Sequence, residues 1–246
     1  MHLWLTNPDE ITDKGMLKRY EQLLGEDELV SYRELVKSGH RREYLISQAF
    51  LRDVLGYYTN ISPSGFEFER NASGKPGLRH GTPELSDLHF NLSRSSGLMA
   101  CAVCARGKIG VDVEALNPDS GMVDVADHYF SDAEVASLNL LPRGQQQERF
   151  CQIWTLKEAY IKARGEGLSL PLDSFSFDFD NHHHIRLREH SPERIRDDWQ
   201  FWSLQPAPDR VTAVAVEATG CKLRVFSSIP LKDSHELALN DLGLVA

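Results

Sequence analysis

The sequence predicts an α+β protein built as a pseudodimer of two similar halves, each a long helix packed on a small antiparallel sheet. Helical patterns over 14–37 and 41–55 precede strand-like segments in the first half. The second half repeats this order, with helical patterns at 131–139 and 146–164 before further strands. Helices followed by antiparallel strands favour an α+β architecture. The duplication rests on element order, since no residue-level repeat accompanies it.

Each element has a local signal. Residues 1–5 alternate apolar and polar side chains, as a strand does. In the second helix Ile46, Phe50 and Val54 recur every fourth position, and Gly56 is suited to end that helix. The remaining elements are expected as strands at 90–92, 98–105, 109–114, 173–179, 184–189, 199–205 and 211–217. The resulting division is an N-terminal half at 1–107, a C-terminal half at 108–219 and a C-terminal tail at 220–246.

Composition excludes several classes of protein. The 246-residue chain has a net charge of −9, which argues against general nucleic-acid binding. No run of about 18 apolar residues occurs, so no membrane span is expected. Pro8, Asp9 and Glu10 interrupt any apolar run that would make a signal peptide. A cytoplasmic protein is therefore expected.

Two potential metal-binding patterns favour structural interpretations. Cys101 and Cys104 lie in a segment of small apolar residues that is typical of a buried strand. Their spacing of three places them on opposite faces of that strand, so a structural role is favoured over zinc or redox chemistry. The histidine run at 182–184 lies between two strand-like segments and is expected to be a solvated loop.

The segment from Lys108 to Glu114 carries the first candidate chemistry. Ile109, Val111 and Val113 alternate with Gly110, Asp112 and Glu114. Carboxylates at i and i+2 of a strand lie on the same side, where both can bind one hard cation. The alternative is an exposed strand face with two solvated acids.

A helical segment over 154–162 carries the second candidate. At 100° per residue, Thr155, Glu158 and Lys162 fall on one helix face. Glu158 and Lys162 are spaced i,i+4, so an ordinary surface ion pair is one interpretation. In the functional interpretation Glu158 is a third carboxylate at the cation and Lys162 faces a phosphate.

Candidate phosphate-binding groups are spread over the first half. Arg41, Gln48 and Arg52 form a polar stripe along one helix, although such stripes are usually solvated. Lys75 lies in a Gly-Lys-Pro turn that would hold it on a constrained backbone. The segment Asn91–Ser95 offers hydroxyl groups and a guanidinium beside a short strand.

These segments, in this order, resemble the 4′-phosphopantetheinyl transferase superfamily. The motifs are GKP at 74–76, FNLSRS at 90–95, IGVDVE at 109–114, FSDAE at 130–134 and WTLKEAYIK at 154–162. The chain length and the two-halved layout resemble the surfactin-type (Sfp-like) branch, a monomeric pseudodimer. The resemblance covers residues 41–177, and it makes the N-terminal half the nucleotide-binding side.

The resemblance implies a role for each motif position. The magnesium-binding acids match Asp112, Glu114 and Glu158, and the lysine that faces the coenzyme A pyrophosphate matches Lys162. The positions that hold the nucleotide and its 3′-phosphate match Lys75, Ser93 and Arg94, and Arg41 and Arg52 resemble the basic positions of the first helix. The family usually has histidine where this chain has Arg94, which keeps a positive charge and a fork suited to phosphate.

The implied activity is transfer of the 4′-phosphopantetheine group from coenzyme A to a serine of an apo carrier protein. Magnesium is the implied cofactor, adenosine 3′,5′-bisphosphate the implied second product, and Glu158 and Lys162 the implied catalytic residues. An alternative is a non-catalytic relative that binds coenzyme A or a carrier protein. A nucleotide phosphotransferase is disfavoured because no glycine-rich phosphate loop occurs.

Overall fold

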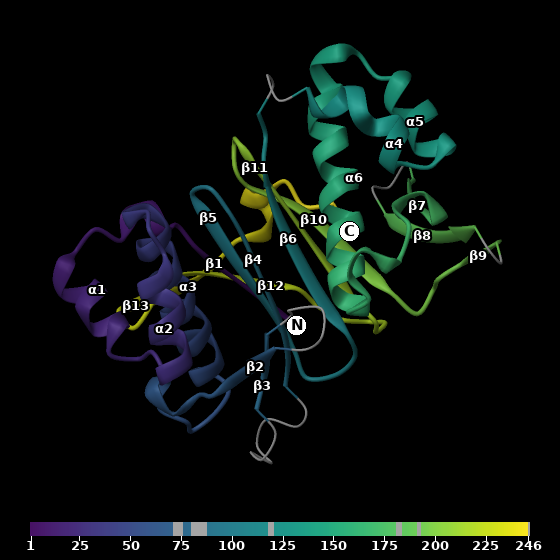
Figure 1. The fold of residues 1–246 in the computed structure, drawn as a ribbon. Coiled ribbons are helices and arrows are strands. Elements are labelled where there is room, and N and C mark those ends of the chain that lie inside the picture. Colours follow the sequence, from purple (N-terminus) through teal and green to yellow (C-terminus); the bar gives the residue numbers. More distant parts are fainter. Residues whose placement is uncertain (71–75, 80–87, 118–120, 181–183, 191–192, 246) are drawn as a thin grey trace.

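The computed structural model describes residues 1–70, 76–79, 88–117, 121–180, 184–190 and 193–245. Within them the fold is α+β, as predicted, with six α-helices and several small sheets that are largely antiparallel (Figure 1). Lys75 and residues 182 and 183 of the histidine run lie outside the described residues. No helix in the described ranges combines the length and the apolarity needed to cross a membrane.

The first half contributes three strands to a five-stranded sheet that is covered on one side by helices. The strand order is β13-β12-β1-β5-β4. Their bounds are Asp233–Leu237, Arg224–Ile229, His2–Thr6, Leu98–Cys104 and His89–Ser95. Helix α3 (Ser38–Gly56) buries Leu45, Phe50 and Val54 against Trp4 and Met99 of this sheet. A two-stranded ribbon of β2 (Phe68–Arg70) and β3 (Pro76–Leu78) lies beside it.

The prediction of a single helix over 14–37 is wrong. Two helices occur instead, α1 (Lys14–Glu21) and α2 (Glu26–Glu34). The backbone N–H of Gly25 donates to Glu28 Oε2 at 2.8 Å, which caps the start of α2. A carboxylate in the first turn also complements the positive end of the helix dipole. The glycine together with this cap separates the two helices.

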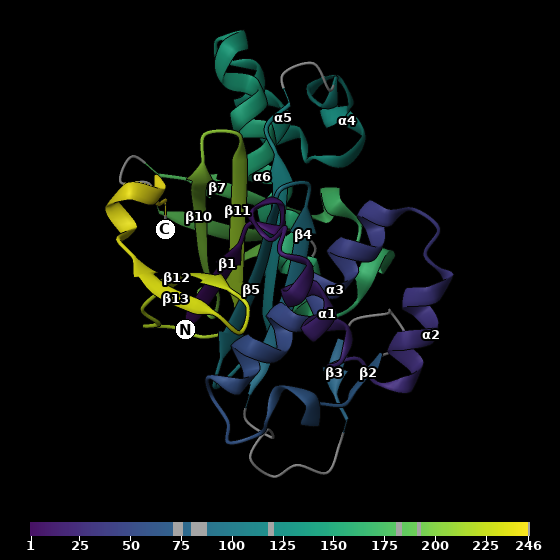
Figure 2. The ribbon, with the colours of Figure 1, turned by 90° about the vertical axis from the view of Figure 1, so that its left-hand side faces the viewer.

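The second half is built around the longest helix, α6 (Arg143–Arg164). It packs against the sheet β10-β11-β6 and, on another side, against the sheet β7-β8-β9 (Figures 1 and 2). The strand bounds are Ile109–Ala115 for β6, Phe175–Phe179 for β7, Ile185–His190 for β8, Glu193–Ile195 for β9, Gln200–Ala207 for β10 and Arg210–Val216 for β11. Short helices α4 (Ala126–Tyr129) and α5 (Asp132–Asn139) cover the start of α6.

The segment expected to be an appended tail contributes to the first sheet. Strand β12 pairs in parallel with β1, from His2 opposite Arg224 to Leu5 opposite Ser227. Its Val225 packs into the core between the five-stranded sheet and the β10-β11-β6 sheet, and its Phe226 packs into the core under α3. A strand buried on both faces lacks the alternation that marks a half-exposed strand, so the sequence pattern did not reveal it.

The five-stranded sheet and the β10-β11-β6 sheet meet at β4 and β6. The side-chain oxygen of Asn91 on β4 accepts a hydrogen bond from the backbone N–H of Val111 on β6 at 2.8 Å. Leu3, Ala100 and Val214 are among the residues that fill the core between the sheets. Cys101 and Cys104 are free thiols that enter different cores, so they lie on opposite faces of β5 as predicted. The pseudodimeric relation of the halves and the boundary at 107/108 stay predictions.

Candidate active site

Gly110 allows α6 to lie directly against β6. A Cβ atom at this position would come within 2.0 Å of the Ala159 carbonyl oxygen and 2.5 Å of the Ala163 amide nitrogen. Both contacts are with backbone, which cannot move aside by a rotamer change. The glycine of the G-x-D-x-E segment therefore sets the spacing between the strand and the helix that carry the candidate site.

Three predicted residues from three elements meet beside this contact. Asp112 on β6 is 4% exposed. Its Oδ1 accepts a hydrogen bond from Ser93 Oγ of β4 at 3.0 Å and an ion-pair contact from Lys162 Nζ of α6 at 2.5 Å. Lys162 Nζ also donates to Ser93 Oγ at 3.0 Å. The structure thus joins Ser93, Asp112 and Lys162 into one cluster.

Glu114 and Glu158 are electrostatically coupled to that cluster. Burial, followed by repulsion from Asp112, raises the pKa of Glu114 to about 7. Burial and then the Asp112 charge also raise the pKa of Glu158. Burial raises the pKa of Asp112 despite the opposing effect of Lys162. The three acids therefore form a region where negative charge is costly unless a cation is bound.

The Asp112 side chain fits a cation ligand. Its second oxygen, Oδ2, is buried and has no hydrogen-bond partner among the described residues. A buried carboxylate oxygen without a donor is unfavourable, so it suits a metal ion. Within the described residues no group of three or more His, Cys, Asp or Glu side chains is close enough to hold a metal ion as the side chains now lie. Magnesium retains several waters and needs only one or two carboxylates, so this donor set still suits it.

A cavity of about 520 Å³ opens from Ser93 into the first half. Its walls come from α2, α3, β2 and β4, together with Arg79. The polar lining groups are Asp27, Glu28, Ser31, Tyr44, Ser47, Gln48, Glu69, Arg79, Ser93 and Arg94. Arg94, which is exposed, lies on this wall next to Ser93. Ser93 thus connects the cavity with the Asp112–Lys162 pair.

The two arginines of α3 lie elsewhere. Arg52 is 1% exposed, and its guanidinium forms an ion pair with Glu28 Oε2 at 2.5 Å. It stands behind the cavity wall and is not one of the described lining residues. Arg41 is exposed and donates to the Leu35 carbonyl oxygen at 2.5 Å. The structure therefore does not bring either arginine into the Ser93–Asp112–Lys162 cluster.

Sequence reasoning assigned no role to Lys157, which precedes Glu158. Lys157 is fully buried, and its Nζ contacts Glu134 Oε2 at 2.8 Å and two backbone carbonyl oxygens at 2.7 and 2.6 Å. Glu134 also accepts from the backbone N–H groups of Ser131 and Phe177. This pair joins the FSDAE and WTLKEAYIK segments. A lysine between Leu156 and Glu158 gave no signal of burial, because its partner lies 23 residues away.

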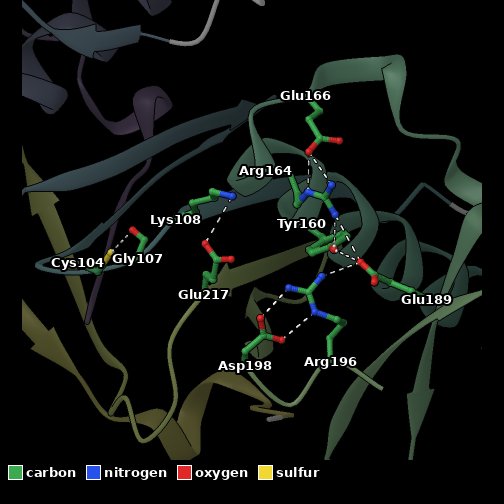
Figure 3. Close-up of polar contacts among 10 residues, drawn as sticks. All are labelled: Cys104, Gly107, Lys108, Tyr160, Arg164, Glu166, Glu189, Arg196, Asp198 and Glu217. Carbon is green, nitrogen blue, oxygen red and sulfur yellow. Dashed lines mark hydrogen bonds and ion pairs between the residues drawn. The ribbon is translucent and has the colours of Figure 1, made fainter. Parts of the chain in front are cut away.

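Figure 3 shows polar contacts among residues at a second cavity, of about 530 Å³. This cavity lies across α6 from Glu158 and Lys162. Tyr160 and Arg164 line it, two residues further along the helix and hence on the opposite face. Glu189 accepts from the Tyr160 hydroxyl at 3.1 Å and from Arg196 at 2.8 Å, and Arg164 lies 3.5 Å away. These charges are mutually compensated, so the network ties the β7-β8-β9 sheet to α6.

Comparisons with known proteins identify similar sequences. The family model described as 4′-phosphopantetheinyl transferase superfamily matches residues 108–215. The 4′-phosphopantetheinyl transferase HetI of a Nostoc species is 33% identical over 222 residues, covering 89% of each chain. The 4′-phosphopantetheinyl transferase Sfp of Bacillus subtilis is 32% identical over 151 residues, covering 60% of this chain and 64% of that one.

A solved structure resembles part of the chain more distantly. A holo-(acyl-carrier-protein) synthase from Bacillus anthracis, solved in complex with CoA (3′,5′-ADP), is 20% identical, with a TM-score of 0.38. The match covers 46% of this chain and 96% of the synthase.

The chain belongs to the 4′-phosphopantetheinyl transferase superfamily. It is an enzyme, a 4′-phosphopantetheinyl transferase, as its curated relatives are. The alternative of a non-catalytic relative is thereby disfavoured.

Proposed function

We propose that the protein transfers the 4′-phosphopantetheine group of coenzyme A to a serine of an apo carrier protein, releasing adenosine 3′,5′-bisphosphate in a magnesium-dependent reaction. The observation that carries the proposal is the buried, unpartnered Asp112 Oδ2 beside Lys162, which donates to a serine on the wall of a cavity. The chain is proposed to act as a cytoplasmic monomer, and carriers of fatty-acid, polyketide or peptide synthesis are the partner class.

Asp112, Glu114 and Glu158 would hold the magnesium ion. Held there, the ion would supply positive charge to neutralise the pyrophosphate. Its positive charge also lowers the pKa values that burial and mutual repulsion raise at these acids. The carboxylates are thereby kept ionised at neutral pH, which is the state that binds metal.

Lys162 and the first-half cavity would hold the rest of coenzyme A. Lys162 would supply a compact positive charge toward the phosphate that leaves, and Ser93 and Arg94, which line the cavity, would contact the nucleotide. Lys75 is proposed at the nucleotide phosphate on the resemblance alone. Arg41 and Arg52 retain only secondary support, because one is exposed and the other is paired with Glu28.

Glu158 is the proposed base for the attacking serine of the carrier. Its carboxylate, which the bound ion would keep ionised, is the group that could accept the serine proton, directly or through a metal-bound water. It lies on α6 one turn before Lys162, so the base and the charge that stabilises the leaving group come from one rigid helix. Catalysis is then mostly positioning and electrostatic stabilisation.

The direct test is to incubate the protein with coenzyme A, magnesium and a panel of apo carrier proteins and to weigh the carriers. A phosphopantetheine mass increase that EDTA abolishes is expected. Asp112→Ala and Glu158→Ala are expected to stay folded and to lose transfer by at least about a hundredfold.

The matched control is Asp178→Ala, which removes a half-exposed acid paired with Arg188 and is expected to leave transfer unchanged. Normal transfer by Asp112→Ala or Glu158→Ala would contradict the assignment of the metal ligands.

A further inference from the structure

The cluster of Ser93, Asp112 and Lys162 has a feature that the proposed reaction does not explain. In the reaction Asp112 binds the metal and Lys162 binds a phosphate, yet in the structure the two are bound to each other. We propose that Lys162 is an internal counterion that competes with the metal for Asp112, so that the metal and coenzyme A bind cooperatively. This inference rests on the proposed function.

Burial is the reason that Asp112 needs a counterion. The side chain is 4% exposed, and leaving a buried carboxylate without a positive partner is strongly destabilising. Lys162 Nζ and Ser93 Oγ both donate to Oδ1, so this oxygen is well compensated. Lys162 therefore supplies the positive charge that neutralises Asp112 in this structure, the role that the metal would have in the proposed reaction.

The same arrangement makes metal binding costly. A divalent cation on Oδ2 would share one carboxylate with the Lys162 ammonium group, which contacts Oδ1. Two positive charges on one buried carboxylate repel each other strongly, because water screens them little. When coenzyme A is absent, a metal ion can therefore bind only against this repulsion or after Lys162 moves away from Asp112.

The Lys162 side chain is partly exposed and lies beside the first-half cavity wall. It is 31% exposed, and Ser93, to which it also donates, lines the cavity of the first half. A phosphate bound at this edge gives the ammonium group a new partner. Coenzyme A would then draw Lys162 from Asp112 as the metal arrives, and by linkage the metal would favour coenzyme A equally.

Isothermal titration with MnCl₂, in the absence and presence of saturating coenzyme A, tests this competition. No carrier is present, so coenzyme A is not consumed, and a titration without protein corrects for metal bound by coenzyme A itself. The wild-type protein is expected to bind Mn²⁺ at least about tenfold more tightly with coenzyme A, within the usual range of coupling.

The Lys162→Met variant distinguishes two explanations of cooperative binding. In one, Lys162 competes with the metal for Asp112; in the other, a phosphate of coenzyme A simply binds the metal. Without the ammonium group, the free protein is expected to bind Mn²⁺ about tenfold more tightly than wild type, and coenzyme A is expected to improve Mn²⁺ binding less. Bridging alone predicts no gain in the free variant. Lys108→Met removes the same charge from the start of β6, where Lys108 faces Glu217, and is expected to behave like wild type.

Each result has a defined meaning. Equal Mn²⁺ affinity with and without coenzyme A in the wild type overturns the inference, and so does a folded Lys162→Met protein that binds Mn²⁺ no more tightly than wild type. Either result leaves the proposed transfer reaction intact. If the wild type binds neither Mn²⁺ nor coenzyme A, the proposed function fails as well.

Discussion

Two lysines five residues apart on α6 have opposite environments. Lys162 is partly exposed and donates to Ser93 on a cavity wall, whereas Lys157 is buried between Glu134 and the carbonyl oxygens of Leu172 and Phe175. Burial lowers the pKa of Lys157, and Glu134 opposes that shift. All three of its donors are used, which is the condition under which a buried ion pair is tolerated.

Removing one partner of this pair is expected to destabilise the protein. Lys157→Met leaves the buried Glu134 carboxylate without its cation and is expected to lower the free energy of unfolding by about 3–5 kcal/mol. Urea denaturation followed by circular dichroism measures the change. Arg188→Met breaks a half-exposed ion pair with Asp178 and is expected to cost less than about 1 kcal/mol. Equal effects of the two variants would contradict the structural role of Lys157.

His2 is expected to make stability depend on pH. Trp4 Nε1 donates to the Tyr58 hydroxyl oxygen at 2.7 Å, and the same hydroxyl lies 2.6 Å from His2 Nδ1, which can accept its proton when the histidine is neutral. Burial, and then the N-terminal amine and Arg224, lower the pKa of His2, while Glu236 opposes them. The folded state therefore binds fewer protons than the unfolded state, and stability falls as the pH drops through about 6.5.

The measurement compares the wild type with His2→Gln, which keeps an acceptor but does not titrate. Between about pH 7.5 and pH 5.5, on either side of the ordinary histidine pKa, the wild type is expected to lose more unfolding free energy than the variant. His40→Gln, at an exposed position of α3, is expected to keep the wild-type pH dependence. Identical pH profiles for the wild type and His2→Gln would contradict this role of His2.

At the scale of elements, the contact between β6 and α6 positions the site. Gly110→Ala places a methyl group against the α6 backbone, which no side-chain rotation relieves. The free energy of unfolding is expected to fall by about 3 kcal/mol or more, and transfer activity is expected to fall with it because Asp112 and Lys162 are separated. Urea denaturation and the carrier-loading assay measure both effects.

Gly144→Ala is the matched control for this substitution. It lies in the first turn of α6, where a Cβ atom meets nothing within 4 Å. A stabilisation of less than about 1 kcal/mol is expected, because alanine favours the helix. A Gly110→Ala protein as stable as Gly144→Ala would show that the strand and the helix are less tightly packed than the structure indicates.

Elements with a regular pattern were predictable from the sequence. The alternation of apolar and polar residues over 109–114 predicted β6. The recurrence of apolar residues every fourth position in 41–55 predicted α3, whose observed bounds are Ser38–Gly56. Patterns of one segment carry no information about partners, however. Arg52 was expected at a phosphate, but Glu28 of another helix pairs with it. Asp112, by contrast, was singled out by its own strand and the order of motifs, and the structure places its side chain against Ser93 and Lys162.

At the scale of the whole molecule, the last residues complete the first sheet. Strand β12 lies between β1 and β13, and the Tyr20 hydroxyl donates to the Pro230 carbonyl oxygen at 2.7 Å. A chain ending at residue 219 would expose the edge of β1 and part of both adjoining cores. It is expected to lack cooperative thermal unfolding by circular dichroism and to aggregate during size-exclusion chromatography.

A shorter deletion distinguishes this role from a general effect of truncation. Removal of residues 239–246 keeps β12 and β13 but loses the buried Leu242 and the backbone pairing of Ser203 with Val245. This protein is expected to unfold cooperatively at a lower temperature than the full chain. Cooperative unfolding of the 1–219 chain near the temperature of the full chain would support the predicted tail instead.

The pairing of β1 with β12 also bears on how the protein is made. His2 leaves the ribosome 222 residues before its partner Arg224. At about 5–20 residues per second, translation keeps β1 waiting for roughly ten seconds or more with its edge unpaired. The first sheet must therefore close after most of the chain has been synthesised, and chaperones that shield exposed strand edges are expected to matter most during that interval.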